Sequence, residues 1–345
     1  MARVKLEDVC ERGSSNLKQS DVVDKDGDYP IYGASGYIGN VDFYHQEQPY
    51  VAVVKDGAGI GRTTLHPAKS SVIGTMQYLL PKGNVLPEYL CYVVKYMHLE
   101  KYFTGATIPH IYFKDYKNEE FNLDSLDRQK EIVSTLNKIE KVIESRTKEL
   151  ELLDELIRAR FVEMFGNPDV NEKNWNVYKM EQLCEVGSSK RIYQNDQSLT
   201  GIPFLRISDL VNRMDTGSKD CDLFIPEELF EKFKKQGLVP ARGDILLTAR
   251  GTLGRCYIIQ DDDEFYFQDG MITWLSKFDE KITPLYISYL FEMPEFRKQI
   301  DSLQAGSTVA YLSISMTKEL NVMVPPLELQ NQFAAFVAQT DKSKF

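Results

Sequence analysis

With 345 residues, of which 43% are hydrophobic, the chain is long enough for two or three domains with buried cores, but its apolar runs are too short for a membrane-spanning helix. The five cysteines form no C-x-x-C pair and the four histidines are scattered, which argues against a disulfide framework or a metal site and favours the reducing cytoplasm. The net charge of −10, taken alone, argues against a nucleic-acid-binding protein, although it does not describe any one face of the molecule.

Residues 1–124 are expected to fold as one module, mostly of β structure with some helix. A short opening helix is expected around Glu7–Cys10, and the apolar run Tyr50–Val54 has the composition of a buried strand. Turn-forming residues at Asp56–Gly59 follow this strand. Further along, Pro87–Tyr96 is typical of a helix with proline in its first turn.

The clearest predicted helix runs from about Leu126 to Phe165, inside a spacer at residues 125–167, and stops at Gly166–Pro168. Its seam positions alternate four and three residues apart, which is the pattern of a coiled coil with one polar member. At 1.5 Å per residue the helix would be roughly 60 Å long. A partner helix is therefore expected, the alternative being a surface helix packed along its own domain. The seam comprises Ile132, Leu136, Ile139, Ile143, Arg146, Leu150, Leu153 and Ile157.

An internal repeat is the most informative feature of the chain, because residues 4–15 return as residues 178–189. This period is far longer than the ~20–50 residues of a solenoid repeat, so it indicates a duplicated domain. The second module is expected at 168–324, followed at 325–345 by a second copy of the spacer helix about half as long as the first. Further landmark pairs, in the same order, are Cys10 with Cys184, Ile60–Arg62 with Leu253–Arg255, Gly105–Ile108 with Gly306–Val309, and Leu126–Gln129 with Leu327–Gln330.

Several of these stretches are similar to signature segments of a known family. Tyr29–Gly39, Val53–Gly61 and, in the second copy, Thr248–Gly254 resemble parts of the target-recognition domains of type I restriction–modification specificity subunits. Gly306–Thr308, followed by Val322–Gln330, resembles that family's entry into its helical spacer. The resemblance covers nearly the whole chain, and the order of the segments, repeated twice, is more specific than any single one.

The resemblance implies an α+β fold class with two tandem homologous mixed α/β target-recognition domains, separated by a long coiled-coil helix and followed by a short C-terminal helix. It implies a non-catalytic subunit in which each domain reads one half of a bipartite, asymmetric double-stranded DNA target. The helices would set the gap between the half-sites and dock two modification (methyltransferase) subunits, with restriction subunits as a further partner. No cofactor is expected on this chain, since S-adenosylmethionine belongs to the methyltransferase subunit. Because the second helix is short, self-association of the chain is a further expectation, since a second copy could complete the helix pair.

Candidate DNA contacts follow from the chemistry of phosphates and base edges, which favours cationic, hydroxyl and amide side chains. Arg62 and Arg255 hold equivalent positions after a turn, whereas Arg206, Arg213 and Arg250 have no basic counterpart in the first module and are expected to read sequence. For each single residue the alternative is a solvated surface charge, and for the hydroxyls a structural turn. The candidates are Lys18, Lys55, Arg62, Lys69, Thr107, His110 and Lys114, then Lys190, Arg191, Arg206, Arg213, Arg250, Arg255, Ser307, Thr308 and Tyr311.

Two other function classes are compatible with parts of the chain. The glycines of Gly57–Gly61 suggest a nucleotide site, but Arg62–Pro67 does not continue as a helix and the second copy, Arg250–Gly254, loses the glycine pattern. A stand-alone methyltransferase is therefore disfavoured. A coiled-coil adaptor that binds proteins through its two modules would suit the acidic charge. Salt-dependent DNA affinity distinguishes DNA recognition from this adaptor.

Overall fold

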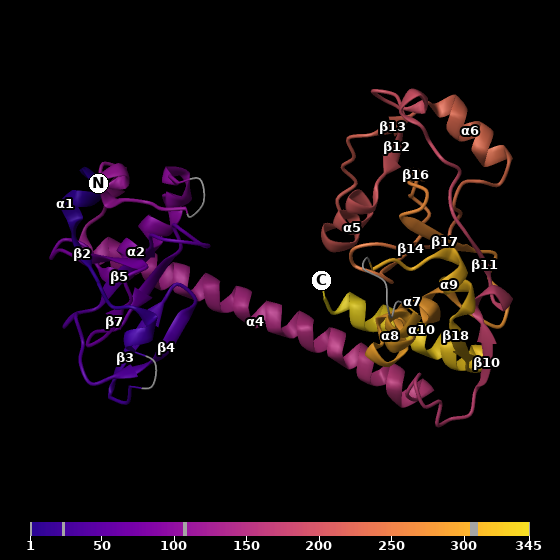
Figure 1. The fold of residues 1–345 in the computed structure, drawn as a ribbon, viewed down its shortest axis with the longest axis horizontal. Helices are drawn as coiled ribbons and strands as arrows, with labels where there is room; N and C mark the ends of the chain where they lie inside the picture. The colour runs from indigo at the N-terminus through magenta and orange to yellow at the C-terminus, as the bar shows by residue number, and fades with distance from the viewer. Residues whose placement is uncertain (1, 23–24, 106–108, 304–309, 345) are drawn as a thin grey trace. The chain divides into compact units, whose positions relative to one another are not determined.

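The chain divides into two compact units, Met1–Arg146 and Thr147–Phe345, and the long helix α4 (Leu126–Phe165) contributes residues to both (Figure 1). Each unit is described by itself below. The computed structural model describes residues 2–22, 25–105, 109–303 and 310–344.

The first unit is built mainly of short strands, as predicted, and its described residues also form short helices before α4. Its helices before α4 are α1 (Leu6–Val9), α2 (Pro87–Tyr96) and α3 (Phe113–Tyr116). Its strands are β1 (Ala2–Lys5), β2 (Cys10–Ser14), β3 (Tyr29–Gly33), β4 (Gly36–Val41), β5 (Tyr50–Val54), β6 (Thr63–His66), β7 (Ser71–Val72), β8 (Met76–Pro81) and β9 (Glu120–Leu123).

Three sheets organise this unit. The largest is antiparallel with strand order β2-β8-β5-β6, a second has the order β4-β3-β7 with β3 and β7 parallel, and β1 pairs with β9 in a two-stranded ribbon. Every residue of β5 is buried, because α2 covers one face of its sheet while the second sheet packs against the other. Strands buried on both faces are continuous apolar runs, which is why Tyr50–Val54 was recognisable in the sequence.

The second unit contains more helix than the first. Its helices besides α4 are α5 (Ile207–Thr216), α6 (Glu227–Lys235), α7 (Pro284–Glu292), α8 (Pro294–Leu303), α9 (Ile314–Glu319) and α10 (Leu327–Lys342). Its strands are β10 (Asn176–Lys179), β11 (Glu185–Gly187), β12 (Ile202–Leu205), β13 (Phe224–Ile225), β14 (Ile245–Thr248), β15 (Cys256–Ile258), β16 (Tyr266–Phe267), β17 (Ile272–Ser276) and β18 (Asn321–Val324).

The sheets of the second unit repeat those of the first. Its four-stranded sheet has the order β11-β17-β14-β15, its three-stranded sheet β13-β12-β16 contains one parallel pair, and β10 pairs with β18. Each sheet corresponds strand for strand to one in the first unit, which confirms the predicted domain duplication and the α+β class. The helices α5 and α6 lie between β12 and β14 and have no helical counterpart between β3 and β5, so they account for much of the inserted sequence.

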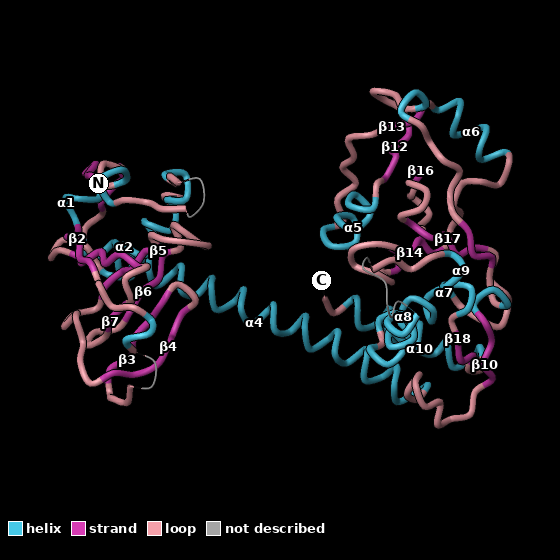
Figure 2. Tube along the Cα trace, viewed as in Figure 1, coloured by secondary structure: helices cyan, strands magenta, loops and turns pink. Residues whose placement is uncertain are grey.

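Helix α4 has the bounds predicted from the sequence and is drawn as one continuous helix in Figure 2. Near its start, Ile132 packs against the core of the first unit. Near its end, Phe161 and Phe165 are fully buried in the second unit, where their rings lie 5.5 and 5.4 Å from that of Phe333 in α10. The middle of the predicted seam is exposed, with side chains 49%, 59% and 42% accessible at Ile139, Ile143 and Leu150, respectively. Among the described helices, α4 included, none is apolar enough over a sufficient length to cross a bilayer.

A buried glutamine joins the first turn of each long helix to its own unit. In α4, the side-chain oxygen of Gln129 accepts a hydrogen bond from the backbone N–H of Leu86 at 2.9 Å, and its nitrogen donates to two backbone carbonyls. In α10, Gln330 accepts from the backbone N–H of Thr283 at 2.8 Å and likewise donates to two carbonyls. Both glutamines are at most 1% exposed. The predicted equivalence of the two helix starts is thus confirmed by the same three backbone hydrogen bonds at each glutamine.

The equivalent thiols Cys10 and Cys184 are also bonded alike, each donating to the backbone carbonyl four residues before it, Leu6 and Met180, respectively. Burial raises the pKa of both thiols to about 12, so they remain neutral and unreactive. All five cysteines of the chain are free. The same repeat position therefore holds a small buried thiol in both units.

We expect Gln330→Leu to lower the free energy of unfolding of the second unit by about 3 kcal/mol, because one backbone N–H and two carbonyls lose their partner inside the protein. Both tryptophans of the chain, Trp175 and Trp274, belong to this unit, so urea unfolding followed by tryptophan fluorescence reports on it selectively. The matched control is Gln339→Leu on the exposed side of the same helix, which should change stability by less than about 0.5 kcal/mol. Equal effects of the two variants would contradict the assigned role of Gln330.

Candidate nucleic-acid interface

In both units a buried strand ends in a glycine-containing turn that places an arginine at the same point of the sheet. The backbone N–H of Val54 donates to the carbonyl of Arg62 at 2.9 Å, and that of Thr248 donates to the carbonyl of Arg255 at 3.0 Å. Within the first turn, Gly61 has a φ of +81°, and a Cβ there would lie 2.7 Å from a neighbouring backbone nitrogen. The turn therefore requires glycine, and the position of Arg62 depends on it.

The two equivalent arginines have different partners. Arg62 is exposed, and its Nη1 donates to the backbone carbonyl of Ala34 in the β3–β4 turn at 2.9 Å. Arg255 donates from Nη2 to the carboxylate of Asp215, at the end of α5, at 2.6 Å. This hydrogen bond holds the pKa of Asp215 below its ordinary value. Both guanidinium groups thus reach the surface, Arg62 beside the β3–β4 turn and Arg255 beside the inserted helix α5.

The remaining basic candidates of the first unit are spread over its surface. Lys18 and Lys69 are exposed, and Lys69 has a positive φ of 54°. Lys114 is also exposed, with its Nζ 5.3 Å from the centre of the ring of Tyr112. These three lysines are therefore described as separate surface cations. Three predicted hydroxyl contacts lie outside the described residues: Thr107, Ser307 and Thr308.

Lys55, His110, Arg250 and Tyr311, by contrast, are brought together in pairs beside the arginine turns. Lys55 is half-buried and its Nζ lies 3.9 Å from the carboxylate of Asp56, which also contacts His110. In the second unit, the guanidinium of Arg250 lies 5.0 Å from the centre of the ring of Tyr311. Asp56 and His110 are joined by an isolated β-bridge, as are Arg250 and Tyr311, so the backbone at these four residues is fixed.

Two other candidates of the second unit are already paired with carboxylates. Arg191 is exposed and contacts Asp269 at 2.8 Å. Arg206 binds Asp209 through two nitrogens, at 2.9 and 3.1 Å, which raises the pKa of the guanidinium. Lys190 is exposed, with its Nζ 5.5 Å from the centre of a phenylalanine ring. The side chains of Arg191 and Arg206 are 65% and 41% exposed, so solvent weakens both pairs and these cations can exchange partners at small cost.

Arg213 requires a correction, because it was expected to read DNA sequence and instead lies inside the second unit. It is 8% exposed, its guanidinium contacts the carboxylate of Asp263 at 3.5 Å, and it stacks 4.8 Å from the ring centre of Phe265. The side chain of Asp263 is itself only 1% exposed. An arginine enclosed in this way holds α5 against its neighbours and cannot reach a DNA groove in this conformation.

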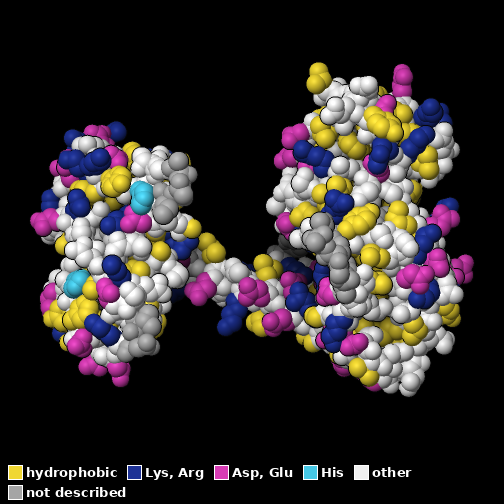
Figure 3. Space-filling view, viewed as in Figure 1, with side chains coloured by type: hydrophobic (Ala, Val, Ile, Leu, Met, Phe, Trp, Pro, Cys, Tyr) yellow, Lys and Arg dark blue, Asp and Glu magenta, His cyan; other side chains and the backbone are white. Residues whose placement is uncertain are grey.

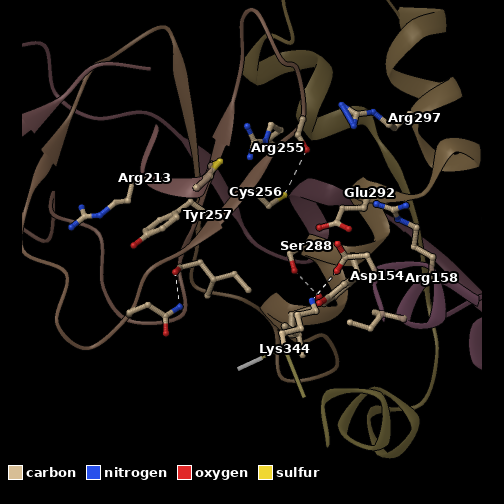
Figure 4. Close-up of a pocket in the computed structure, with 17 residues that line it drawn as sticks. Asp154, Arg158, Arg213, Arg255, Cys256, Tyr257, Ser288, Glu292, Arg297 and Lys344 are labelled. Atoms are coloured by element: carbon tan, nitrogen blue, oxygen red, sulfur yellow. Dashed lines mark hydrogen bonds and ion pairs between the residues drawn. The ribbon is translucent and has the colours of Figure 1, made fainter. Parts of the chain in front are cut away.

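A cleft of about 710 Å³ in the second unit was missed by the sequence analysis (Figure 4). Its lining brings Arg158 of α4, Arg255 and Arg297 of α8 near one another, together with Lys344, which pairs with Asp154 at 2.8 Å. Arg297 also donates to a backbone carbonyl of the Arg255 turn. These residues come from segments far apart in the chain, so no local signal could have gathered them.

Within the described part of the chain, no group of three or more metal-ligating side chains is arranged to hold a metal ion.

Lysine and arginine side chains are interspersed with aspartate and glutamate on the face shown in Figure 3, on each unit taken separately. This mixture agrees with the carboxylate partners of Arg191, Arg206 and Arg255. The negative net charge therefore coexists with exposed cations on both units. Two equivalent α+β domains with arginines at matching turns have the architecture of a tandem recognition protein.

Comparison with known proteins agrees with this architecture. The model of a family described as "Type I restriction modification DNA specificity domain" matches residues 1–155 and again residues 172–345. The chain belongs to this family and carries two copies of its domain. The resemblance found in the sequence is thereby confirmed, and with it the prediction of a DNA-recognition subunit that is not itself an enzyme.

Individual relatives are similar over most of their length. A sequence from Haemophilus influenzae, assigned as a type I restriction enzyme specificity subunit, is 26% identical over 324 residues, which is 90% of this chain and 80% of the relative. The MjaVIII specificity subunit of Methanocaldococcus jannaschii is 24% identical over 84% of this chain and 72% of its own length. A solved structure of a type I S subunit from M. genitalium shares the fold, with a TM-score of 0.61 at 15% identity, covering 99% of this chain and 90% of that one.

We expect Arg213→Ala to lower the free energy of unfolding of the second unit by about 2 to 3 kcal/mol, because the buried carboxylate of Asp263 loses its cation. Arg206→Ala removes a half-buried pair at the start of the same helix, where the arginine side chain is 41% exposed, and should cost only about 1 kcal/mol. Urea unfolding followed by tryptophan fluorescence measures both. A stable Arg213→Ala protein with altered DNA recognition would overturn the structural role given to Arg213.

Proposed function

We propose that each module reads one half of a bipartite, asymmetric DNA sequence, the first through residues 1–124 and the second through 168–324. The observation that carries this proposal is the presence of one framework twice, with Arg62 and Arg255 at the same turn and different side chains around them. A shared framework supplies phosphate contacts that position each module, and divergent side chains supply different base contacts. Identical modules would instead favour a palindromic target.

The DNA-contacting residues remain proposals. Arg191, Arg206 and Arg255 are suited to phosphates, because each reaches solvent and is held by a carboxylate in an ion pair that solvent weakens. We retain every described candidate except Arg213. The retained candidates are Lys18, Lys55, Arg62, Lys69, His110, Lys114, Lys190, Arg191, Arg206, Arg250, Arg255 and Tyr311.

We further propose that the helices set the gap between half-sites and bind two modification subunits, with restriction subunits as an additional partner. The exposed seam of α4 supports this assignment, since Ile139, Ile143 and Leu150 present an apolar stripe that an amphipathic partner helix would bury. S-adenosylmethionine would then be bound by the modification subunit rather than by this chain. An assembly that acts on chromosomal DNA belongs in the cytoplasm.

Self-association through the same seam is the second candidate. A second copy of α4 would cover these apolar residues as well as a partner subunit could. The two possibilities differ in mass, so light scattering of the chain alone and of the chain with the modification subunit separates them. A monomer that gains two modification subunits favours the first possibility, and a stable dimer without partners favours the second.

The proposed function predicts a split methylated motif. The chain is co-expressed with the modification subunit from the same genome, and methylated bases in the host DNA are mapped by sequencing. We expect an asymmetric two-part motif that disappears when this chain is omitted. Replacing residues 4–124 with the first module of another specificity subunit should change only one part of the motif. A change in both parts would refute modular reading, and the absence of any motif would favour a protein-binding adaptor.

The proposed role of α4 as a spacer between the half-sites can be tested by shortening the helix. Deleting residues 137–150 removes two heptads, all exposed in the structure, and therefore preserves the seam register. At 1.5 Å per residue the helix loses roughly 21 Å, so the gap in the methylated motif should shorten by up to about 6 base pairs. Circular dichroism checks that the variant is folded. A folded variant whose motif keeps the original gap would show that α4 does not determine the spacing.

A further inference from the structure

One pair of side chains occupies the same backbone positions in both units but carries different chemistry. In the first unit, Asp56 and His110 form an isolated antiparallel β-bridge; in the second unit, Arg250 and Tyr311 form the corresponding bridge. Asp56 and Arg250 each lie two residues after the buried strand that leads into the arginine turn, β5 and β14, respectively. Three of these four residues, His110, Arg250 and Tyr311, are separate candidates in the sequence, where no local pattern pairs them.

The equivalence of the two pairs rests on their backbone hydrogen bonds. The N–H of Ile111, next to His110, donates to the carbonyl of Lys55 at 2.9 Å, and the N–H of Leu312, next to Tyr311, donates to the carbonyl of Ala249 at 3.0 Å. The N–H groups of Lys55 and Ala249 in turn donate to matching loop carbonyls, at 3.0 and 2.9 Å. The main chain is therefore held in the same way on both sides of each pair.

In the first unit the pair is centred on a carboxylate. Nδ1 of His110 lies 2.5 Å from Oδ1 of Asp56, and about a third of each side chain is exposed, 36% and 31%, respectively. The other carboxylate oxygen lies 3.9 Å from the Nζ of Lys55. The imidazole thus orients a partly exposed group whose free lone pairs can accept hydrogen bonds.

In the second unit the pair is centred on a cation. Arg250 is exposed, and its guanidinium lies 5.0 Å from the centre of the Tyr311 ring, within the range of a cation–π contact. Stacking on a half-buried ring restricts the guanidinium plane while leaving its N–H groups free to donate outward. The same bridge therefore presents hydrogen-bond acceptors in one unit and donors in the other.

We propose that this bridge pair is a specificity-determining position that makes the two half-sites different. Arg250 donates to the O6 and N7 acceptors of a guanine, and Asp56 accepts from the exocyclic amino group of a cytosine or adenine, with Tyr311 and His110 as positioning residues. The inference rests on the proposed function, because it requires that each module reads a half-site. It goes beyond that function by naming the positions that distinguish the two modules and the class of base that each position selects.

The alternative is that both pairs only close their loops. A loop-closing role predicts lower stability on substitution but no change in the bases that are selected. A phosphate contact by Arg250 predicts weaker binding that is uniform across sequences. Only a base contact changes the preference at one position of one half-site.

The test uses the chain co-expressed with its modification subunit, and it reads the methylated motif by sequencing host DNA. Arg250→Gln and Arg250→Lys should each reduce methylation of sites with the selected guanine roughly 10-fold or more relative to sites with other bases there, and leave the first half-site unchanged. Asp56→Asn should alter one position of the first half-site only. The matched control is Arg242→Gln, an arginine of the second unit that is 75% exposed and pairs with Asp261, which should leave the motif intact.

The outcomes separate this inference from the proposed function. A wild-type chain that directs no split motif would refute the proposed function itself. A wild-type split motif that stays the same in Arg250→Gln, Arg250→Lys and Asp56→Asn would leave the proposed function standing and overturn the base-reading role. Exchange of the pair, Asp56→Arg with His110→Tyr, gives an independent gain-of-function measure: the first half-site should acquire a preference for guanine, and loss of binding without a new preference counts against the proposal.

Discussion

The architecture depends on one buried contact made twice, the glutamine that fastens the start of each long helix to its unit. Gln129 and Gln330 each bond three backbone groups, so the helix begins at a fixed point and in a fixed direction relative to its own sheets. A helix attached only by apolar contacts could rotate or slide at modest cost. Three directional bonds inside a protein do not permit this, because each unmet group costs about 1 to 3 kcal/mol. Everything proposed for α4 as a spacer requires such a fixed origin.

The duplicated framework also explains how one fold can recognise two different sequences. The strand, the turn and the bridge that follows it have the same hydrogen bonds in both units, whereas the side chains at the bridge and the inserted helices α5 and α6 differ. The shared backbone keeps Arg62 and Arg255 in place. The side chains that differ between the units stand at positions whose backbone is fixed by hydrogen bonds. The side chains of the binding surface can therefore differ between the units without destabilising the core.

Regular features were predictable from the sequence, while three-dimensional surroundings were not. The bounds Leu126–Phe165 followed from the heptad seam and the Gly-Asn-Pro stop, and β5 from its unbroken apolar run. Arg213 was misassigned, although it lies three residues after the buried Leu210 and thus on the inner face of a helix. Its partner Phe265 is 52 residues further on, and no local pattern connects the two. The pairing of Arg250 with Tyr311 was hidden for the same reason.

The acidic charge of −10 first argued against DNA binding, and the structure indicates why that argument fails. Arg191, Arg206 and Arg255 each have a carboxylate partner in the second unit, so the surface is locally neutral while its cations remain accessible. The three guanidinium side chains are 31% to 65% exposed, and pairs open to solvent on one side contribute only about 1 kcal/mol, so a phosphate can replace the carboxylate with little loss of stability. The displaced carboxylate is then left beside the DNA and repels its phosphates. This repulsion disfavours binding wherever the fit between protein and DNA is poor. A protein that must select rare sites benefits from weak affinity for all other DNA, because non-specific binding arises from unopposed positive charge.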